Sequence, residues 1–199
     1  MIEIKLDEKK LAQVQALLRS IPKGMPKVMS RAINKTAGKA RTDLTKALAD
    51  KVALKKKYIR DNIKLRKASY RRWQADLSLA YWPINLRHFG ARQTKTGVSY
   101  QIFKDGGRAL LEHAFIVERF GKNVFKRLAP DDDPEGIVTR HGGSAPSVPR
   151  LPISIQRGPS LKEIYTEDSA LPARTMADAM QNLERNVDMQ IRVLLERRR

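Results

Sequence analysis

The sequence predicts an α+β fold, in which a long N-terminal helix and a C-terminal helix pack on a small antiparallel sheet of about four strands. Three observations predict this class. Apolar residues recur every three or four positions before residue 50 and again after residue 172, which is helical spacing. Between residues 75 and 128 they alternate with polar residues, as strands require. Five prolines and three glycines at 130–152 predict a long mobile loop.

The N-terminal part is expected to begin with a strand at 2–6 and a first helix that Ile21-Pro22 ends. A second, long helix is expected from Pro26 to about Asp50. Its apolar stripe is formed by Val28, Ala32, Ile33, Ala37, Ala40, Leu44 and Leu48. At about 100° per residue, the opposite face carries Lys27, Arg31, Lys35 and Lys46. The spacing therefore predicts a packing side and a cationic side on one helix.

Further cations follow this helix. A short helix is expected over 55–62, where Lys55, Lys56, Lys57 and Arg60 lie close together, and a basic run continues to residue 72. Residues 1–72 hold 21 Lys and Arg against 6 Asp and Glu, so they carry +15 of the net charge of +19. Such a field favours a polyanion, either nucleic acid or an acidic protein surface. The alternative is a solvated face that binds nothing.

The sheet is expected at 73–129. Its first strand begins at Ala75 and places Leu77, Leu79 and Tyr81 on one face. The next two strands, at 98–103 and 110–117, are joined by a hairpin whose Asp105-Gly106-Gly107 residues tolerate a positive φ. A turn at Gly121-Lys122-Asn123 leads to a last strand at 124–128. We expect one antiparallel meander, with the second helix covering its apolar face.

The C-terminal part, 153–199, is expected to hold a strand and a long helix. Ser160 and Glu163 have the spacing of a capping box at a helix start. The last helix is expected to begin at Pro172, and its stripe, which serves either the core or a subunit interface, is Met176, Met180, Leu183, Val187, Ile191 and Leu194. The four parts 1–72, 73–129, 130–152 and 153–199 are expected to form a single domain.

Catalytic and metal-binding patterns are missing from the sequence. The chain has no cysteine, which excludes disulfides, thiolate metal sites and cysteine nucleophiles. Its histidines, His88, His113 and His141, lack the pairing of a helix-borne metal site. Asp131–Asp133 invite comparison with magnesium-dependent nucleases, but they lie in the Pro-rich segment without further carboxylates on rigid elements. We expect no cofactor, no metal and no enzymatic activity.

No apolar run is long enough to span a membrane, and the N-terminus lacks a signal-peptide core, so a cytoplasmic start and no membrane partner are expected. Aromatic residues are interleaved with the cations at Tyr58, Tyr70 and Trp73. Two interpretations stay open for them: stacking on nucleic-acid bases, or anchoring a helix or strand to the core.

One segment, Phe89-Gly90-Ala91-Arg92-Gln93-Thr94-Lys95-Thr96-Gly97-Val98-Ser99-Tyr100, resembles the minor tail protein Z family of long-tailed phages and prophages. Other segments resemble the family in the same order, from about residue 25 to 165. They are Ala32-Ile33-Asn34-Lys35-Thr36, Ala114-Phe115-Ile116, Val124-Phe125-Lys126-Arg127, Leu151-Pro152-Ile153-Ser154-Ile155 and Arg157-Gly158-Pro159-Ser160.

The resemblance implies a non-catalytic virion component, made in the bacterial host cytoplasm, that acts in tail completion near the head-proximal end. The implied partners are other tail or head-completion proteins, further copies in a homo-oligomeric ring, and packaged DNA inside it. The candidate contacts with DNA or an acidic surface are Lys27, Arg31, Lys35, Lys46, Lys55, Lys56, Lys57, Arg60, Arg92 and Lys95. The last two lie in an expected flexible basic loop between Gly90 and Gly97, which serves either assembly or simple chain connection.

The alternative function is a stand-alone nucleic-acid-binding protein without sequence preference. It would use the same cations on phosphates and would need no ring.

Overall fold

The computed structural model describes residues 2–4, 8–19, 21, 23–127 and 153–196. The expected mobile loop at 130–152, with Asp131–Asp133 and His141, lies outside the described residues. The α+β class is confirmed, with long helices near both ends of the chain and short antiparallel strands between them. The described chain forms two compact units. The first comprises residues 1–48, 56–81 and 162–199, and the second comprises 49–55 and 82–161.

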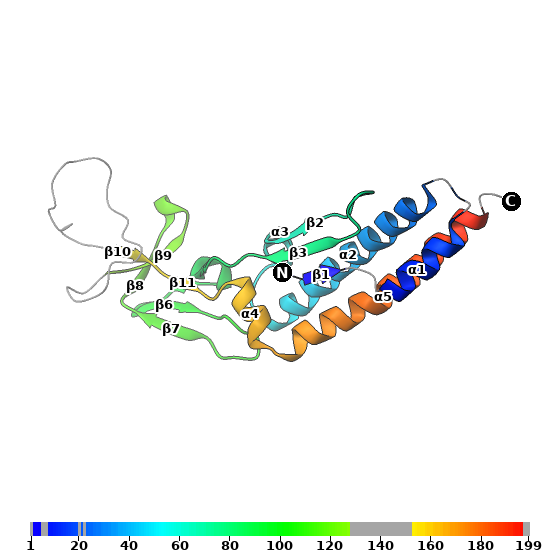
Figure 1. The fold of residues 1–199 in the computed structure, drawn as a ribbon. Coiled ribbons are helices and arrows are strands. Elements are labelled where there is room, and N and C mark those ends of the chain that lie inside the picture. The colour runs from blue at the N-terminus through cyan, green and yellow to red at the C-terminus, as the bar shows by residue number, and fades with distance from the viewer. Residues whose placement is uncertain (1, 5–7, 20, 22, 128–152, 197–199) are drawn as a thin grey trace. The chain divides into compact units, whose positions relative to one another are not determined.

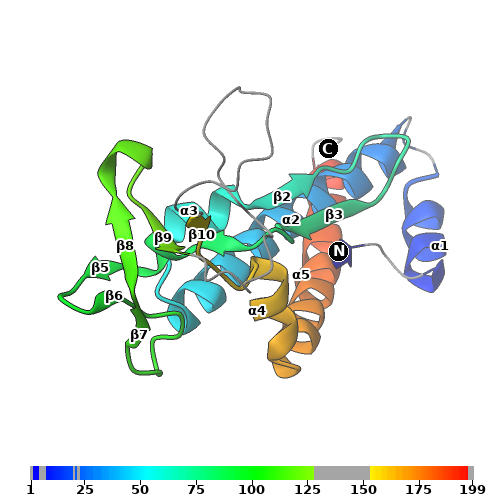
Figure 2. The same cartoon turned by 90° about the vertical axis from the view of Figure 1, so that its left-hand side faces the viewer.

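Most of the first unit is helical. Its helices are α1 (Glu8–Leu17), α2 (Gly24–Lys51), α3 (Lys56–Asp61), α4 (Leu161–Glu167) and α5 (Ala170–Glu196). The last three residues of α2 and the first residue of α4 belong to the second unit. Pro26 lies in the first turn of α2, where a missing N–H costs nothing. All seven residues of the predicted α2 stripe are buried. Helix α5 runs beside α2 (Figures 1 and 2), and a buried hydrogen bond joins Thr36 to Asn186.

The apolar stripe predicted for the last helix is buried only in part. Leu183, Val187 and Ile191 are buried, whereas Met176 is 38% exposed. Ser160 directly precedes α4 and Glu163 is the third residue of this helix, as the capping-box spacing predicts.

The sheet of the first unit has the order β1-β3-β2 and is antiparallel. Its strands are β1 (Ile2–Ile4), β2 (Ile63–Arg66) and β3 (Ala75–Leu79). Strand β2 was not predicted, since its region was interpreted only as a basic run. Tyr81 was predicted on the apolar face of β3, and this is wrong: it lies beyond the end of the strand and is 72% exposed.

The second unit contains three short antiparallel sheets. One has the order β5-β6-β7 (Arg92–Gln93, Gly97–Tyr100, Ala109–Glu112). The second has the order β10-β9-β8 (Ile153–Ile155, Asn123–Arg127, Ala114–Val117). The third pairs β4 (Ile84–Asn85) with β11 (Arg157–Gly158). Two short 3₁₀ helices, Leu86–Phe89 and Glu118–Phe120, connect strands.

The strands of the second unit do not form the single meander that the alternation predicted. His113 has a φ of 59°, so the expected strand at 110–117 is interrupted there. Strand β7 before it pairs with β6, and strand β8 after it pairs with β9. The chain thus passes from one sheet to another at a single left-handed residue.

Both expected hairpins are present, but one closes differently. The turn predicted at Gly121-Lys122-Asn123 joins β8 to β9, and it has positive φ at Gly121 (74°) and Lys122 (57°). Gly106 and Gly107 do not have positive φ; among the described glycines only Gly90 and Gly121 do. The β6–β7 connection is instead closed by the Gln101 side chain, whose amide donates to the carbonyls of Lys104 and Gly106, at 3.2 and 2.8 Å.

Two phenylalanines lie in the otherwise aliphatic core of the second unit. Phe89 and Phe125 are fully buried, and the rings of Phe115 and Phe125 stack with centroids 6.1 Å apart. Strands β6 and β7 approach so closely at Gly97 that a Cβ atom there would lie 2.1 Å from the Leu111 carbonyl oxygen. Only glycine fits this position without moving the backbone.

Candidate assembly surface

Three of the predicted cations form an exposed strip on α2. Arg31, Lys35 and Lys46 are exposed, and they lie on the side away from the buried stripe. Lys27, at the start of the helix, is only half-buried, because it lines a small hollow with Arg31 and with Gln190, Val193 and Leu194 of α5. Helix α5 therefore borders the strip at its N-terminal end. The Lys35 Nζ of α2 lies 3.4 Å from the sulfur of Met189, which belongs to α5.

Sequence reasoning missed one member of this strip. Lys39 is exposed and lies one turn after Lys35. Its spacing of four residues is the signal that could have found it. Between these cations the strip carries the small residues Gly38 and Thr42, and the Thr42 hydroxyl donates to the Gly38 carbonyl at 3.0 Å.

A second group of cations lies on α3 and β2 of the first unit. Lys56, Lys57 and Arg60 are exposed on α3. The helix ends at Asp61, and the Arg41 guanidinium of α2 donates to the Arg60 carbonyl at 2.7 Å. This bond satisfies one of the carbonyls that every helix end leaves open. It also fixes the cations of α3 relative to α2.

The basic run that follows α3 is a strand with two different sides. Ile63 is buried and Leu65 half-buried, whereas Lys64 and Arg66 are exposed. Lys64 pairs with Ser78 in register, and Arg66 pairs with Asp76. The predicted basic segment therefore contributes to the core with one face and to the charged surface with the other.

The remaining candidates belong to the second unit: Lys55, Arg92 and Lys95, all exposed. The loop between Gly90 and Gly97 lies between strands, as expected, and forms a tight hairpin between β5 and β6; its flexibility stays a prediction. The Gln93 side chain donates to the carbonyls of Thr94 (3.1 Å) and Gly97 (3.0 Å) and accepts from the Ile116 N–H at 2.9 Å. Lys95 is exposed in this turn.

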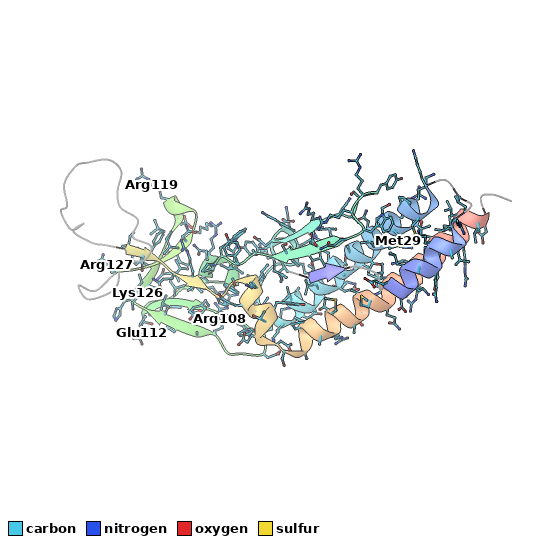
Figure 3. All side chains as sticks on the ribbon, in the orientation of Figure 1. Met29, Arg108, Glu112, Arg119, Lys126 and Arg127 are labelled. Atoms are coloured by element: carbon cyan, nitrogen blue, oxygen red, sulfur yellow. The ribbon has the colours of Figure 1, made fainter. Side chains whose placement is uncertain are left out.

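Near Lys55, the surroundings of one histidine, His88, disfavour its protonation. Burial lowers the pKa of His88 below 6.5, and the positive charges of Arg87 and Lys55 lower it further. The Arg87 Nε donates to the His88 Nε2 at 3.1 Å, which requires an unprotonated acceptor nitrogen. Further cations of this unit that were not predicted as contacts, Arg119 and Arg127, are exposed (Figure 3).

The candidate cations are mostly unpaired. Within the part of the chain that the structure describes, Arg60 is the only one with an ion pair, a 3.7 Å contact with Asp61 in which both side chains are more than half exposed. Such an exposed pair contributes little stability. The remaining charges can therefore be neutralised by a partner instead of by the chain itself.

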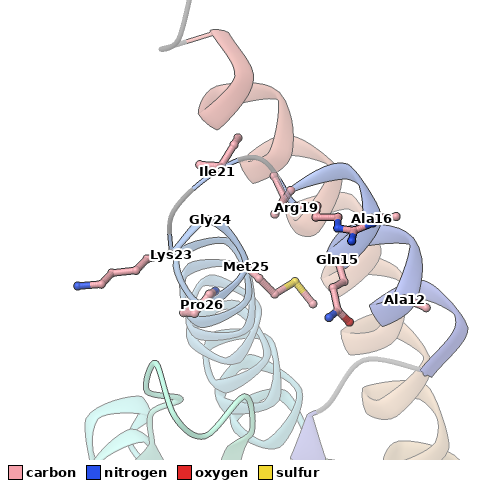
Figure 4. Close-up of a pocket in the computed structure, with 10 residues that line it drawn as sticks. Ala12, Gln15, Ala16, Arg19, Ile21, Lys23, Gly24, Met25 and Pro26 are labelled. Atoms are coloured by element: carbon pink, nitrogen blue, oxygen red, sulfur yellow. The ribbon is translucent and has the colours of Figure 1, made fainter.

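Potential metal ligands are not clustered among the described residues. No group of three or more His, Cys, Asp or Glu that could hold a metal is found among them. An open hollow of about 590 Å³ lies between α1 and the start of α2 (Figure 4). Its lining includes Gln15, Met25 and two basic residues, Arg19 and Lys23, but no acid. None of the described helices is both long and apolar enough to cross a membrane.

Comparisons with known proteins agree with the resemblance found in the sequence. The family model described as Prophage minor tail protein Z (GPZ) matches residues 9–197, which is nearly the whole chain. Searches of curated proteins and of solved structures returned no match.

Proposed function

The chain belongs to the prophage minor tail protein Z family, and from this premise we propose that it completes the phage tail at its head-proximal end. In the proposal, several copies close a ring around the DNA path through head-to-tail contacts, since such contacts close into a ring when the rotation between copies permits it. The mature location is the virion tail, and the partners are other tail or head-completion proteins.

The family is one of structural tail proteins and is not an enzyme family. The proposal extends this to the chain itself, which acts through its surfaces and needs no cofactor. The missing cysteines and nucleotide-binding motifs support this extension.

The α2 strip is the observation that carries the proposal beyond family membership. Arg31, Lys35, Lys39 and Lys46 are exposed and form no ion pair with the described residues. They extend over about 22 Å of helix, at 1.5 Å per residue. A duplex carries about one phosphate per 1.7 Å of its axis, so the strip could contact several phosphates and release their counterions. Inside a ring, it would face either packaged DNA or an acidic surface of the tail.

Electron cryomicroscopy of virions tests the proposed location. Deleting the gene from the phage that encodes the chain is expected to remove density at the head-proximal end of the tail and to abolish infectivity. A plasmid copy is expected to restore both. Density lost from the distal end or from the tail tube would contradict the proposal.

The role of the strip is tested with Lys35→Gln, Lys39→Gln and Lys46→Gln combined, which removes three charges without adding repulsion. Incorporation into tails is expected to fall, and any binding to duplex DNA is expected to show a weaker salt dependence. The combined variant Lys162→Gln, Arg174→Gln and Arg185→Gln removes three exposed charges from α4 and α5 and is the matched control. A monomer that binds DNA tightly at about 0.15 M salt but is never found in virions would favour the stand-alone nucleic-acid-binding alternative instead.

A further inference from the structure

The loop that joins β2 to β3, residues 67–74, combines cations and aromatic side chains in a fixed conformation. It extends beyond the ends of the two strands (Figure 1). It contains Lys67, Arg71 and Arg72 with Tyr70 and Trp73, and no acidic residue occurs between Asp61 and Asp76. The family resemblance and the α2 strip leave this loop without a role.

The base of the loop is clamped to helix α2. The Asn34 side chain donates to the Ala68 carbonyl at 3.0 Å and accepts from the Ala68 N–H at 2.8 Å. Ala68 is only 8% exposed. Both backbone groups of this residue are thus satisfied by one amide side chain, so the loop leaves the helix at a fixed point.

A compact turn forms the tip. The Ser69 N–H donates to the Arg72 carbonyl at 2.8 Å, and the Arg72 N–H donates to the Ser69 hydroxyl at 3.2 Å. The indole N–H of Trp73 donates to the Tyr70 carbonyl at 3.0 Å. Trp73 is therefore used to hold the turn and is half-buried.

The return of the loop into β3 is anchored by a buried carboxylate. Asp76 is 5% exposed and forms an ion pair with Arg72, and it also accepts from the Gln74 amide at 3.0 Å. The charge of Arg72 is thus neutralised inside the loop. Lys67 and Arg71 are not neutralised in this way, since they have no ion pair with the described residues.

The side chains left on the outside are Lys67, Tyr70 and Arg71. All three are exposed, Tyr70 to 53%. Tyrosine and arginine are enriched among the residues that dominate the energetics of protein interfaces. The tyrosine ring buries a large area at a low cost in conformational entropy. A loop already fixed by six hydrogen bonds and an ion pair loses little further entropy on binding.

We propose that this tip, Lys67-Tyr70-Arg71, docks into an acidic cleft on a different protein of the tail, with Tyr70 entering the cleft and the two cations meeting carboxylates at its rim. The inference rests on the proposed function for the identity of the assembly. Two other partners fit the tip less well. Duplex DNA keeps its bases paired and offers phosphates, which need neither an aromatic ring nor a fixed loop. A second copy of the chain shows no clustered acidic site for the tip, since no group of three or more Asp, Glu or His side chains close enough to hold a metal is found among its described residues.

Variants of the full chain, expressed in the gene-deleted phage, test the docking role. Tyr70→Ala and Arg71→Glu are each expected to lower incorporation into virions, measured by quantitative blot, by roughly ten-fold or more. Tyr70→Phe, which keeps the ring, is expected to restore incorporation. Lys162→Glu is the matched charge reversal, since Lys162 is exposed in the first turn of α4. Circular dichroism and melting of the purified variants should equal those of the wild type.

Suppressor selection identifies the partner. Starting from Arg71→Glu, restored phage are expected to carry a change of Asp or Glu to Lys or Arg in the gene of another tail protein. Normal incorporation of both tip variants would overturn the inference. So would suppressors confined to this chain, or a loss of duplex-DNA binding by Arg71→Glu as large as the loss of incorporation. Absence of the wild-type chain from virions would instead overturn the proposed function.

Discussion

Thr36 and Asn186 form a buried hydrogen bond that joins the two long helices of the first unit. The Asn186 amide donates to the Thr36 hydroxyl at 2.9 Å, and the two residues are 6% and 0% exposed. Thr36→Val keeps the shape but leaves the amide without its acceptor, so it is expected to lower the free energy of unfolding by about 1–3 kcal/mol. Urea denaturation followed by circular dichroism measures the loss.

The double variant Thr36→Val/Asn186→Leu is the control for this pair. It removes both polar groups, so its loss in the free energy of unfolding is expected to be smaller than the sum of the losses of the two single variants. The difference, the coupling energy, is expected to be about 1 kcal/mol. Strict additivity would mean that the hydrogen bond does not determine how α2 and α5 pack.

Two glycines are expected to respond in opposite directions to alanine. Gly38 lies in the middle of α2, and nothing lies within 4 Å of the position a Cβ would take. Gly38→Ala is therefore expected to raise the free energy of unfolding by about 1 kcal/mol. At Gly97 the Cβ would meet the Leu111 carbonyl oxygen, so Gly97→Ala is expected to lower it by about 1–3 kcal/mol. Equal effects in chemical denaturation would contradict both assignments.

His88 is expected to make the stability of the second unit depend on pH. Its pKa lies below 6.5 in the folded protein because of burial and the cations beside it. Below pH 6.5 the unfolded chain therefore binds more protons than the folded chain, and stability falls as the pH decreases toward the folded pKa. His88→Gln should remove this part of the slope. Identical pH profiles of unfolding for the two proteins would contradict the assignment.

At the level of elements, the sequence predicted the parts whose signal is local. The α2 stripe repeats over many turns, so its burial and the exposed cations opposite it followed from spacing. Strand β2 was missed because its alternation covers only four residues and is dominated by charge. Pairing with β3 stabilises this strand, and the pairing depends on residues ten to sixteen positions away.

The break at His113 shows why the sheet organisation could not be predicted. Residues 110–117 are all apolar except Glu112 and His113, which is compatible with one continuous strand. Non-glycine residues seldom adopt the positive φ that His113 has. The backbone changes sheets there because β7 and β8 each find a different partner strand. No local composition signals that choice.

The candidate surface, like the fold, could be predicted only where its signal is local. The α2 cations follow from the helical period, but the loop at 67–74 depends on Asn34, which precedes Ala68 by 34 residues. Asn34→Ala is expected to leave α2 helical and to speed amide hydrogen exchange at Ala68 and Ser69 by ten-fold or more, since about 1.4 kcal/mol corresponds to a factor of ten. Unchanged exchange at Ala68 would show that the loop is held by its own turn alone.

At the scale of the whole molecule, we propose that the two units unfold as the single domain that the sequence predicts. The two tryptophans of the chain report on them separately, because Trp73 belongs to the first unit and Trp82 to the second. Trp73→Phe and Trp82→Phe are each expected to give the same urea midpoint by fluorescence and by circular dichroism. Two separate midpoints would divide the chain into two independently folding domains.

The clamp on Ala68 has a consequence for the order of events in assembly. Closing a contact between residues so far apart along the chain is a late event compared with forming helix α2 itself. A nascent or misfolded copy in which Asn34 has not reached Ala68 does not present Tyr70 and Arg71 in their docking arrangement. The loop that joins β2 to β3 would then act as a proofreading device, because only copies that have finished folding could dock and be incorporated into the virion.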